Sequence, residues 1–196
     1  QVTFTSTLNF NGSESFTVSV TDGEYTDSQI MTVTVTPIND APVLDAILDQ
    51  NMDEGGSKVI VLSAVDIDGD NLIFSALGTS NIQVLLNGPI LTLIPEENFN
   101  GSEIITATVS DGEYTAEQIF TVTVDPVNDA PVLAEVSSVT YNEDESGTLD
   151  LSASDVDVDV LTFSISGGNQ ITAILDGSQV TFTSTLNFNG SESFTV

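Results

Sequence analysis

A period of 89 residues runs through the chain and constrains its fold more than any other feature. The hexapeptide Asn-Phe-Asn-Gly-Ser-Glu begins at Asn9, at Asn98 and at Asn187. The sequence Asn-Asp-Ala-Pro-Val-Leu obeys the same shift, from Asn39 to Asn128. A fixed period of this kind indicates one structural unit repeated in tandem, so we expect copies of a single small domain.

A second period lies on top of the first, because residues 1–18 are identical to residues 179–196, a displacement of 178 residues. Alternation between two types of unit explains this identity. The repeat predicts the C-terminal half of a unit over 1–40, a complete unit over 41–129 and the N-terminal part of the next unit over 130–196. We therefore expect the chain to be a window from a longer array.

Within the complete unit, apolar and polar residues alternate in short segments that Gly, Asn, Asp and Pro separate, which is typical of strands and turns. Thr, Val, Ile and Phe, which favour strands, dominate these segments. Strands are expected at 43–48, 58–65, 72–77, 82–86, 90–94, 104–109 and 118–124. Seven short strands predict an all-β fold of tandem immunoglobulin-like Greek-key sandwiches. Phe74, Ile105 or Ala107, Phe120 and Val122 are expected to face inward, with the Thr residues between them facing water.

The charge of the chain is strongly one-sided, with 30 acidic residues against a single basic one, Lys58, and a formal net charge of -29. Almost no carboxylate can form an ordinary salt bridge. Oxygen-rich clusters select hard cations, so Ca²⁺ is the expected counter-ion. Nucleic acid and anionic membrane are poor partners for such a chain, and no apolar run long enough for membrane insertion is present. The absence of Cys excludes disulfides and thiolate metal sites.

Two groups of alternating aspartates carry the sharpest chemical signal. Asp66, Asp68 and Asp70 return one period later as Asp155, Asp157 and Asp159. Alternate residues of an extended segment project to one side, so their carboxylates crowd together and repel one another unless a divalent ion lies between them. The alternative is a solvated polar turn after a strand.

The segments Asn39-Asp40-Ala41-Pro42 and Asn128-Asp129-Ala130-Pro131 lie between successive units. Proline limits bending there, and Asn and Asp offer oxygen ligands. A plain linker made of common turn residues is the alternative interpretation.

In combination, these motifs resemble cadherin-type repeats, in particular the cadherin-like tandem repeats of giant bacterial surface adhesins. The resemblance rests on an early Glu (Glu54, Glu143), the Asp-x-Asp pairs, Asp111-Gly112 and a closing strand that leads into Asn-Asp-Ala-Pro-Val. It implies immunoglobulin-like domains that bind Ca²⁺ at their junctions, where ions bridge carboxylates of successive units and stiffen the array. It also implies a secreted or cell-surface bacterial location.

The resemblance further implies which residues bind the metal. At the junction around Asn128 and Asp129 these would be Glu54 and Glu97 from the upstream unit, together with Asp155 and Asp157 from the downstream unit. At the junction around Asn39 and Asp40 they would be Asp66, Asp68 and Asp111, with Leu8 at the position that corresponds to Glu97. The linker is shorter than that of animal cadherins, and Pro37 and Pro126 shift the preceding acidic position, so one or two ions per junction are expected rather than three.

The repeated Asn-Gly-Ser at Asn11, Asn100 and Asn189 fits either an N-glycosylation acceptor or a hairpin turn, and the turn is favoured. The preceding Phe10, Phe99 and Phe188 are expected to fill the core beneath it, with stacking on carbohydrate as the alternative. Asp22-Gly23 and Asp111-Gly112 are typical of simple turns.

The composition argues against an enzyme, because the chain has neither His nor Cys. A carboxylate pair of the glycosidase type is formally possible, but the acidic residues map to unit junctions and no Trp offers a platform for sugar.

The leading hypothesis is therefore a Ca²⁺-stiffened rod or fibre that forms part of a large adhesive protein, with neighbouring repeats as its partners. One alternative is a module that binds cell-surface glycan or protein. Another is a self-assembling filament in which incomplete end units complete each other between chains. Those end units together contain 107 residues against a period of 89, so exchange leaves 18 redundant residues and a continuous filament is favoured.

Overall fold

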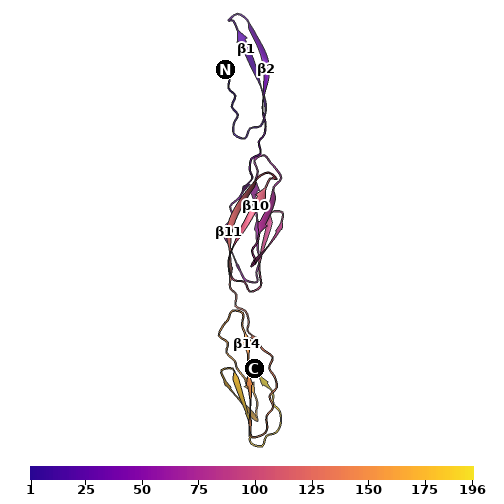
Figure 1. Ribbon diagram of the computed structural model, residues 1–196, viewed down its shortest axis with the longest axis vertical. Coiled ribbons are helices and arrows are strands. Elements are labelled where there is room, and N and C mark those ends of the chain that lie inside the picture. Colours follow the sequence, from indigo (N-terminus) through magenta and orange to yellow (C-terminus); the bar gives the residue numbers. More distant parts are fainter. The chain divides into compact units, whose positions relative to one another are not determined.

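The computed structural model describes all residues from 1 to 196 and consists of strands, turns and loops without a helix (Figure 1). The chain divides into two compact units, Gln1–Pro126 and Val127–Val196. The structure thus contains no helix of the length and hydrophobicity that crossing a membrane requires. The predicted all-β class of tandem immunoglobulin-like units is confirmed.

The N-terminal unit begins with a long hairpin, drawn in indigo in Figure 1, of β1 (Gly12–Thr21) and β2 (Thr26–Val35). The strands pair antiparallel, with Gly12 opposite Val35 and Thr21 opposite Thr26. Asp22 closes the turn, because its Oδ1 accepts the N–H groups of Glu24 at 2.9 Å and Tyr25 at 2.8 Å. The predicted turn at Asp22-Gly23 is confirmed.

A sandwich follows the hairpin within the same unit. One layer is a four-stranded sheet in the order β4-β11-β10-β7, the other is a three-stranded sheet in the order β5-β9-β8, and β3 and β6 form a short pair. The strands are β3 (Val43–Leu44), β4 (Gln50–Asp53), β5 (Lys58–Val61), β6 (Ala64–Val65), β7 (Ile73–Leu77), β8 (Ile82–Asn87), β9 (Ile90–Pro95), β10 (Gly101–Ser110) and β11 (Thr115–Asp125).

The core lies between the two layers and follows from period-two alternation. Ile105 and Ala107 on β10 and Phe120 and Val122 on β11 are at most 2% exposed, as predicted. Phe74 on β7 is only partly buried and packs on this core. The interleaved Thr residues lie on the opposite, outer face of the sheet, where neighbouring side chains of the middle strands leave them half-buried rather than fully exposed.

Strand β4 was not predicted. Its sequence, Gln-Asn-Met-Asp, holds one apolar residue, so the alternation that marks a strand is absent. The segment forms a strand because it pairs with β11. It lies at the sheet edge parallel to β11, with Gln50 opposite Val122 and Asp53 opposite Asp125. The predicted strand over 58–65 is also divided, into β5 and β6 around Leu62.

The prediction of a hairpin turn at Asn-Gly-Ser is wrong. Asn100 and Gly101 lead directly into β10, and the turn lies earlier, where Phe99 N–H donates to the Glu96 carbonyl at 3.1 Å. The left-handed residue is Asn98, with φ of 59°, a conformation that Asn tolerates. β9 and β10 belong to different sheets, so this segment is a crossover between layers rather than a hairpin. Phe99 packs on the core as expected.

The C-terminal unit repeats part of the sandwich. Its sheets are β13-β17-β16, β12-β14 and β15-β18, around a small core of Leu151, Val180 and Phe182. The strands are β12 (Val132–Leu133), β13 (Ser146–Asp150), β14 (Ala153–Ser154), β15 (Ser166–Gly167), β16 (Ile171–Asp176), β17 (Gln179–Ser184) and β18 (Phe194–Thr195). Each pair has its counterpart 89 residues earlier; for example, Thr195 lies opposite Ser166 as Thr106 lies opposite Leu77.

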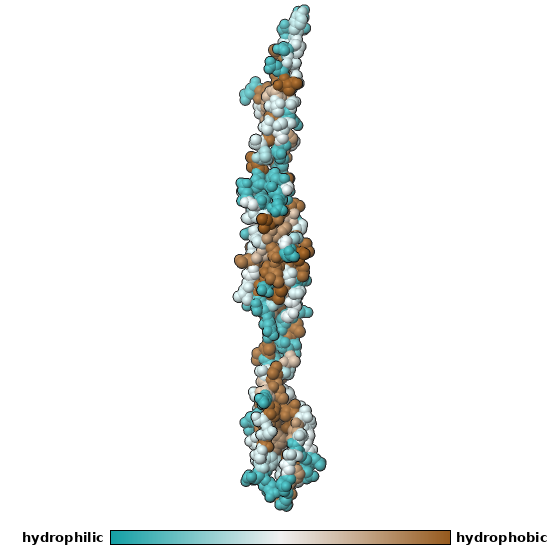
Figure 2. Space-filling view, turned by 90° about the vertical axis from the view of Figure 1, so that its right-hand side faces the viewer, coloured by the Kyte–Doolittle hydropathy of each residue, from teal (hydrophilic) through white to brown (hydrophobic).

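Apolar side chains remain at the surface of the chain. Hydrophobic residues, coloured brown, lie among white and teal residues on the face that Figure 2 shows. Within the hairpin, Val20 is 70% and Ile30 76% exposed.

Candidate metal centre

The first acidic loop, residues 66–70, is wound around the carboxylate of Asp66, directly after β6. Asp66 Oδ1 accepts the N–H groups of Asp68 at 2.9 Å, Gly69 at 3.0 Å and Asp70 at 3.2 Å. Gly69 has φ of 81°, which allows the tight turn that these bonds need. One oxygen of Asp66 is thereby used to hold the loop.

The other oxygen of Asp66 is the unusual feature of this loop. Asp66 Oδ2 is buried and has no hydrogen-bond partner. A buried charged oxygen without a partner is costly, and each such group in a folded protein calls for a compensating ligand. Carboxylate oxygens of Asp66, Asp68 and Asp70 lie within 4.8 Å of one another, so the loop concentrates negative charge.

The linker before the sandwich is attached to this loop. Asp40 N–H donates to Asp68 Oδ2 at 2.7 Å, and Asn39 Nδ2 donates to Asp111 Oδ2 at 2.9 Å. The structure therefore links all five ligands predicted for this junction: Asn39, Asp40, Asp66, Asp68 and Asp111.

Asp111 lies in the turn between β10 and β11. Burial, which raises the pKa of its carboxyl, is the largest single influence, but the N–H groups of Tyr114 and Glu113 and the Asn39 amide together outweigh it and lower the pKa. Asp111 Oδ1 accepts those two N–H groups at 2.6 Å and 2.7 Å, which leaves Oδ2 for Asn39. The predicted turn is confirmed, and the carboxylate is held in its charged form.

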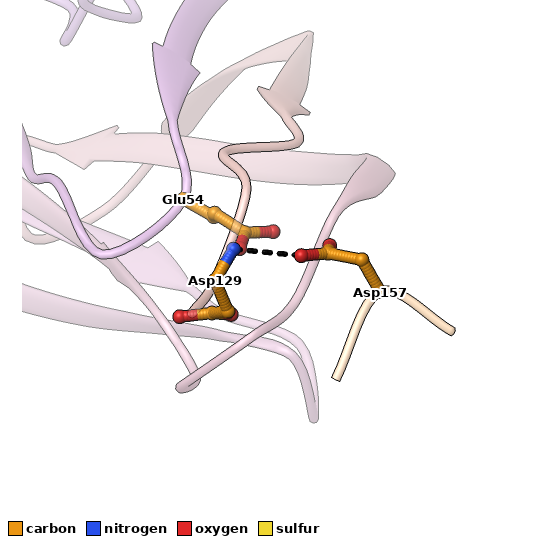
Figure 3. A group of neighbouring side chains, drawn as sticks. All are labelled: Glu54, Asp129 and Asp157. Carbon is orange, nitrogen blue, oxygen red and sulfur yellow. Dashed lines mark hydrogen bonds between the residues drawn. The ribbon is translucent and has the colours of Figure 1, made fainter. Parts of the chain in front are cut away.

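The second acidic loop, residues 155–159, has the same construction in the C-terminal unit. Asp155 Oδ1 accepts the N–H groups of Asp157 at 3.0 Å and Asp159 at 3.3 Å. Asp157 Oδ2 accepts the N–H of Asp129 at 2.7 Å, as the dashed line in Figure 3 shows. This bond is the counterpart, one period later, of the bond between Asp40 and Asp68.

The two loops differ at two positions, and the significance of one of them, Gly69 against Val158, was missed by sequence reasoning. Val158, with φ of 63°, takes the place of Gly69. A β-branched residue in the left-handed region is strained, and such strain is retained where the surroundings require it. Comparison of the two repeats could have indicated this strained position, because the glycine of the first loop is replaced by valine in the second.

The remaining predicted ligands lie outside the residues of the two acidic loops. Glu54 follows β4, where its N–H donates to the Asp125 carbonyl at 2.9 Å and its carboxylate accepts from Asn100 Nδ2 at 3.2 Å. Asn128 donates its side-chain amide to the neighbouring Asp129 carbonyl at 3.0 Å. Glu97 lies exposed in the turn after β9 and makes none of the hydrogen bonds of the acidic loops. Asp70, which the alternating spacing grouped with Asp66 and Asp68 although it was not assigned as a ligand, belongs to their cluster of carboxylates.

Two segments, residues 39–124 and 128–196, match the family model of the bacterial Ig domain. The chain belongs to this family. Bacterial Ig domains of this kind are typically non-catalytic modules, and the two matched segments correspond to the complete sandwich and to the partial one that follows it.

Similarity to individual proteins is weaker. Chitinase A of Pseudoalteromonas piscicida is 28% identical over 130 residues, which cover 64% of this chain and 16% of that enzyme. Human protocadherin-24 EC1-2 is 21% identical with a TM-score of 0.42, over 74% of this chain and 79% of that structure. An endo-fucoidan hydrolase of glycoside hydrolase family 107 is 17% identical with a TM-score of 0.39, over 91% of this chain and 30% of that structure. The chain thus spans a small part of the curated relative.

Proposed function

We propose that this bacterial Ig chain is a non-catalytic spacer of a secreted or cell-surface protein, and that Ca²⁺ bound at its acidic loops stiffens the junctions between units. The observation that supports this most is Asp66 Oδ2, a buried carboxylate oxygen without a partner beside Asp68 and Asp70. A chain with one basic residue cannot neutralise such a cluster itself.

The first junction would bind the ion through Asp66, Asp68 and Asp111, with Asn39 and Asp40 from the linker. The bonds of Asp40 to Asp68 and of Asn39 to Asp111 support this set, because they already tie the linker to the acidic loop and to the turn between β10 and β11. An ion bound there would add electrostatic attraction to a link that two hydrogen bonds now make.

The second junction would bind its ion through Asn128, Asp129, Asp155 and Asp157, with Glu54 and Glu97 supplied by the preceding unit. This set follows the repeat and the resemblance to cadherin-type repeats, and the bond between Asp129 and Asp157 supports it. Glu97 is the weakest member because it lies exposed and none of its atoms takes part in the hydrogen bonds of the acidic loops.

Calcium suits these loops better than magnesium. Ca²⁺ accepts six to eight oxygen ligands in flexible geometry, whereas Mg²⁺ requires a near-ideal octahedron and keeps much of its water. The loops offer carboxylate oxygens, and the linker adds the side-chain oxygens of Asn39 and Asp40, all on irregular segments.

Isothermal titration calorimetry of the 196-residue chain with CaCl₂ tests the proposal. Asp68→Asn is expected to weaken binding at the first junction about tenfold or more, because it removes one charged ligand. Asp27→Asn is the matched control, since it removes the same charge from an exposed position in the hairpin. No measurable Ca²⁺ binding at millimolar concentration, or an equal effect of both variants, would contradict the proposal.

A second candidate function comes from the chitinase similarity. In this alternative, the chain is an accessory spacer within a secreted polysaccharide-degrading enzyme and contacts the polysaccharide. A chitin pull-down of the 196-residue chain separates the two candidates, because a pure spacer stays in the supernatant.

A further inference from the structure

The outer face of the three-stranded sheet β5-β9-β8 carries no charge. Leu91 and Leu93 of the central strand lie in the core, so the residues that alternate with them point away from it. None of the three strands contains Asp or Glu, although the chain has 30 acidic residues, and Lys58 lies opposite Leu93 on the inner side. We call the outward residues the neutral face: Val59, Val61, Gln83, Leu85, Asn87, Ile90, Thr92 and Ile94.

The neutral face exposes aliphatic side chains next to one another. Val59 is 59% exposed and Val61 is 69% exposed. Leu85 and Ile90 are 49% and 44% exposed. Val61 lies opposite Ile90, and Thr92 lies between Val59 and Leu85. Side chains opposite each other on adjacent strands are about 5 Å apart, so these residues form one continuous apolar patch, which is typical of an interaction surface.

The following repeat shows that this sheet forms without an apolar outer face. In the C-terminal unit, the corresponding sheet β13-β17-β16 has the same pairing. One period after Val59, Val61, Asn87, Ile90 and Ile94 stand Thr148, Asp150, Asp176, Gln179 and Thr183. Formation of the sheet therefore does not account for the aliphatic residues of the neutral face, which indicates contact with a partner.

The opposite side of the complete sandwich differs in charge. Ile104 on β10 and Ile119 on β11 are 64% and 66% exposed on the outer face of the four-stranded sheet. Glu117 and Asp125 belong to the same outer face, because they alternate with the buried residues of β11. The neutral face is therefore the outer face of this sandwich that lacks carboxylates.

The charge of the chain indicates which partner fits the neutral face. A cationic partner would be attracted to the carboxylates elsewhere on the chain rather than to an uncharged face. A sugar would need an aromatic platform for stacking, and the three strands contain no aromatic residue. A second copy of the chain carries the same net charge of -29, so it can approach most easily where neither copy presents a carboxylate. Two neutral faces meet this condition.

We propose that the neutral face binds the neutral face of a second copy of the chain. Two sheets that pack face to face lie about 10 Å apart, with their strand directions within about 30° of each other. The contact is isologous, because the same residues meet from both sides. Three strands of this length offer roughly 300 Å² per copy, well below the ~800 Å² per partner of a stable complex. The dimer is therefore weak, with a dissociation constant on the order of 0.1 to 1 mM.

Sedimentation equilibrium of the 196-residue chain in EDTA tests the proposal, because the chelator prevents metal ions from bridging carboxylates. A monomer–dimer equilibrium with a dissociation constant in that range is expected. Added NaCl should strengthen the dimer, since salt screens the repulsion between two negative chains and leaves the apolar contact in place. A chain that stays monomeric at about 1 mM, or a dimer that NaCl weakens, would overturn the proposal.

Two variants of equal charge locate the contact. Val61→Asp introduces the residue that Asp150 supplies one period later, and it should raise the dissociation constant about tenfold or more, because carboxylates would then lie in the contact. Ile119→Asp is the matched control, since its side chain is 66% exposed against 69% for Val61 and lies on the other outer face. Equal effects of the two variants, or no effect of Val61→Asp, would refute the proposal.

Val59→Thr gives a test that does not depend on an added charge. Thr148 occupies the corresponding position in the next repeat, and threonine keeps the branched shape that suits a strand. This variant should weaken the dimer and leave the midpoint of urea unfolding unchanged. Unchanged dimerisation in this variant would contradict an apolar contact at the neutral face.

NMR spectra of the backbone amides at increasing concentration show where the copies meet. Signals of β5, β8 and β9 should shift, and those of β7 and β10 should stay in place. Shifts confined to β1 and β2, which also expose apolar side chains, would show association through the hairpin and would overturn the proposal.

Discussion

At the scale of single residues, the two carboxylate oxygens of one aspartate have different roles in the first acidic loop. Asp66 Oδ1 holds three backbone N–H groups, and Oδ2 is buried without a partner. In the second acidic loop, Val158 occupies the left-handed position that glycine fills in the first. The same loop shape is therefore built with and without strain, and the strain at Val158 is open to measurement.

Val158→Gly is expected to stabilise the second acidic loop by about 1 kcal/mol, because glycine relieves the left-handed strain while adding some backbone entropy to the unfolded chain. The reciprocal change, Gly69→Val, should destabilise the first acidic loop by a similar amount. Amide hydrogen exchange of both loops, measured by NMR, compares the two variants. If amide exchange at residues 155–159 is slower in Val158→Gly than in the original chain, Val158 is strained. Unchanged exchange would contradict the presence of strain.

Glu192 makes the C-terminal unit sensitive to acid. Its carboxylate accepts N–H groups from Asn169, Gln170 and Ile171, all within 2.9 Å, and these bonds lower the pKa of Glu192. A lowered pKa in the folded state means that the stabilisation is present above the ordinary glutamate pKa of about 4.3 and is lost as pH falls through the lowered value.

We expect the unfolding midpoint of the C-terminal unit in urea to fall as pH drops from 6 to 3. Glu192→Gln should flatten this dependence, since the uncharged amide cannot titrate. Glu135→Gln, at an exposed position outside these bonds, is the control and should leave the pH dependence as in the original chain. A pH dependence that survives Glu192→Gln unchanged would exclude this carboxylate as its source.

At the scale of strands, the sequence predicts those strands in which apolar and polar residues alternate strongly. It misses strands that form only because they pair with a neighbouring strand. β10 and β11 alternate over ten and eleven residues, and their buried positions were predicted from period two. β4 was missed because its order comes from its partner β11, far away in the sequence. The turn at Asn98 was misplaced because an Asn-Gly pair stands two residues later.

The candidate site was predictable to a similar degree. Repeated acidic spacing and the linker motif pointed to Asn39, Asp40, Asp66 and Asp68, which hydrogen bonds connect, whereas Asp111 came from the resemblance to cadherin-type repeats. Their role as metal ligands stays a prediction. The orphaned oxygen of Asp66 depends on how the loop folds around it, so it cannot be derived from spacing, whereas the grouping of Asp70 with Asp66 and Asp68 follows from the alternating spacing.

Truncation of two adjacent residues of β11 should reduce the free energy of unfolding by very different amounts. Phe120→Ala is expected to cost about 3 to 5 kcal/mol, because it leaves a cavity in the core. Ile119→Ala should change the free energy of unfolding by less than about 1 kcal/mol, because that side chain is 66% exposed. Urea unfolding followed by circular dichroism compares the two, and equal costs would show that the observed strand register is wrong.

At the scale of the whole molecule, the one-sided charge and the repeated junctions belong together. A formal charge of -29 opposes compaction, and the acidic loops gather part of that charge at segments that hydrogen-bond to the linkers. Ligands that bind only the folded state raise its stability by mass action. Calcium would then act on the fold of each unit and on the freedom between units at once.

Small-angle X-ray scattering is expected to show a narrower range of interdomain orientations in millimolar CaCl₂ than in EDTA. Asp157→Asn should loosen the second junction and leave the first intact, with Asp176→Asn as a control of equal charge at an exposed position. Scattering profiles that are identical with calcium and with chelator would contradict stiffening by the ion.

The parallel pairing of β4 with β11 has a consequence for a protein under tension. β4 is close to the start of the complete sandwich and β11 is its last strand. When two parallel strands are pulled from opposite ends of a domain, their hydrogen bonds are sheared together rather than opened one after another. Glu54 N–H extends this ladder by one bond to the Asp125 carbonyl. A unit tethered in flowing water would therefore resist stretching at the pair of strands that joins its beginning to its end.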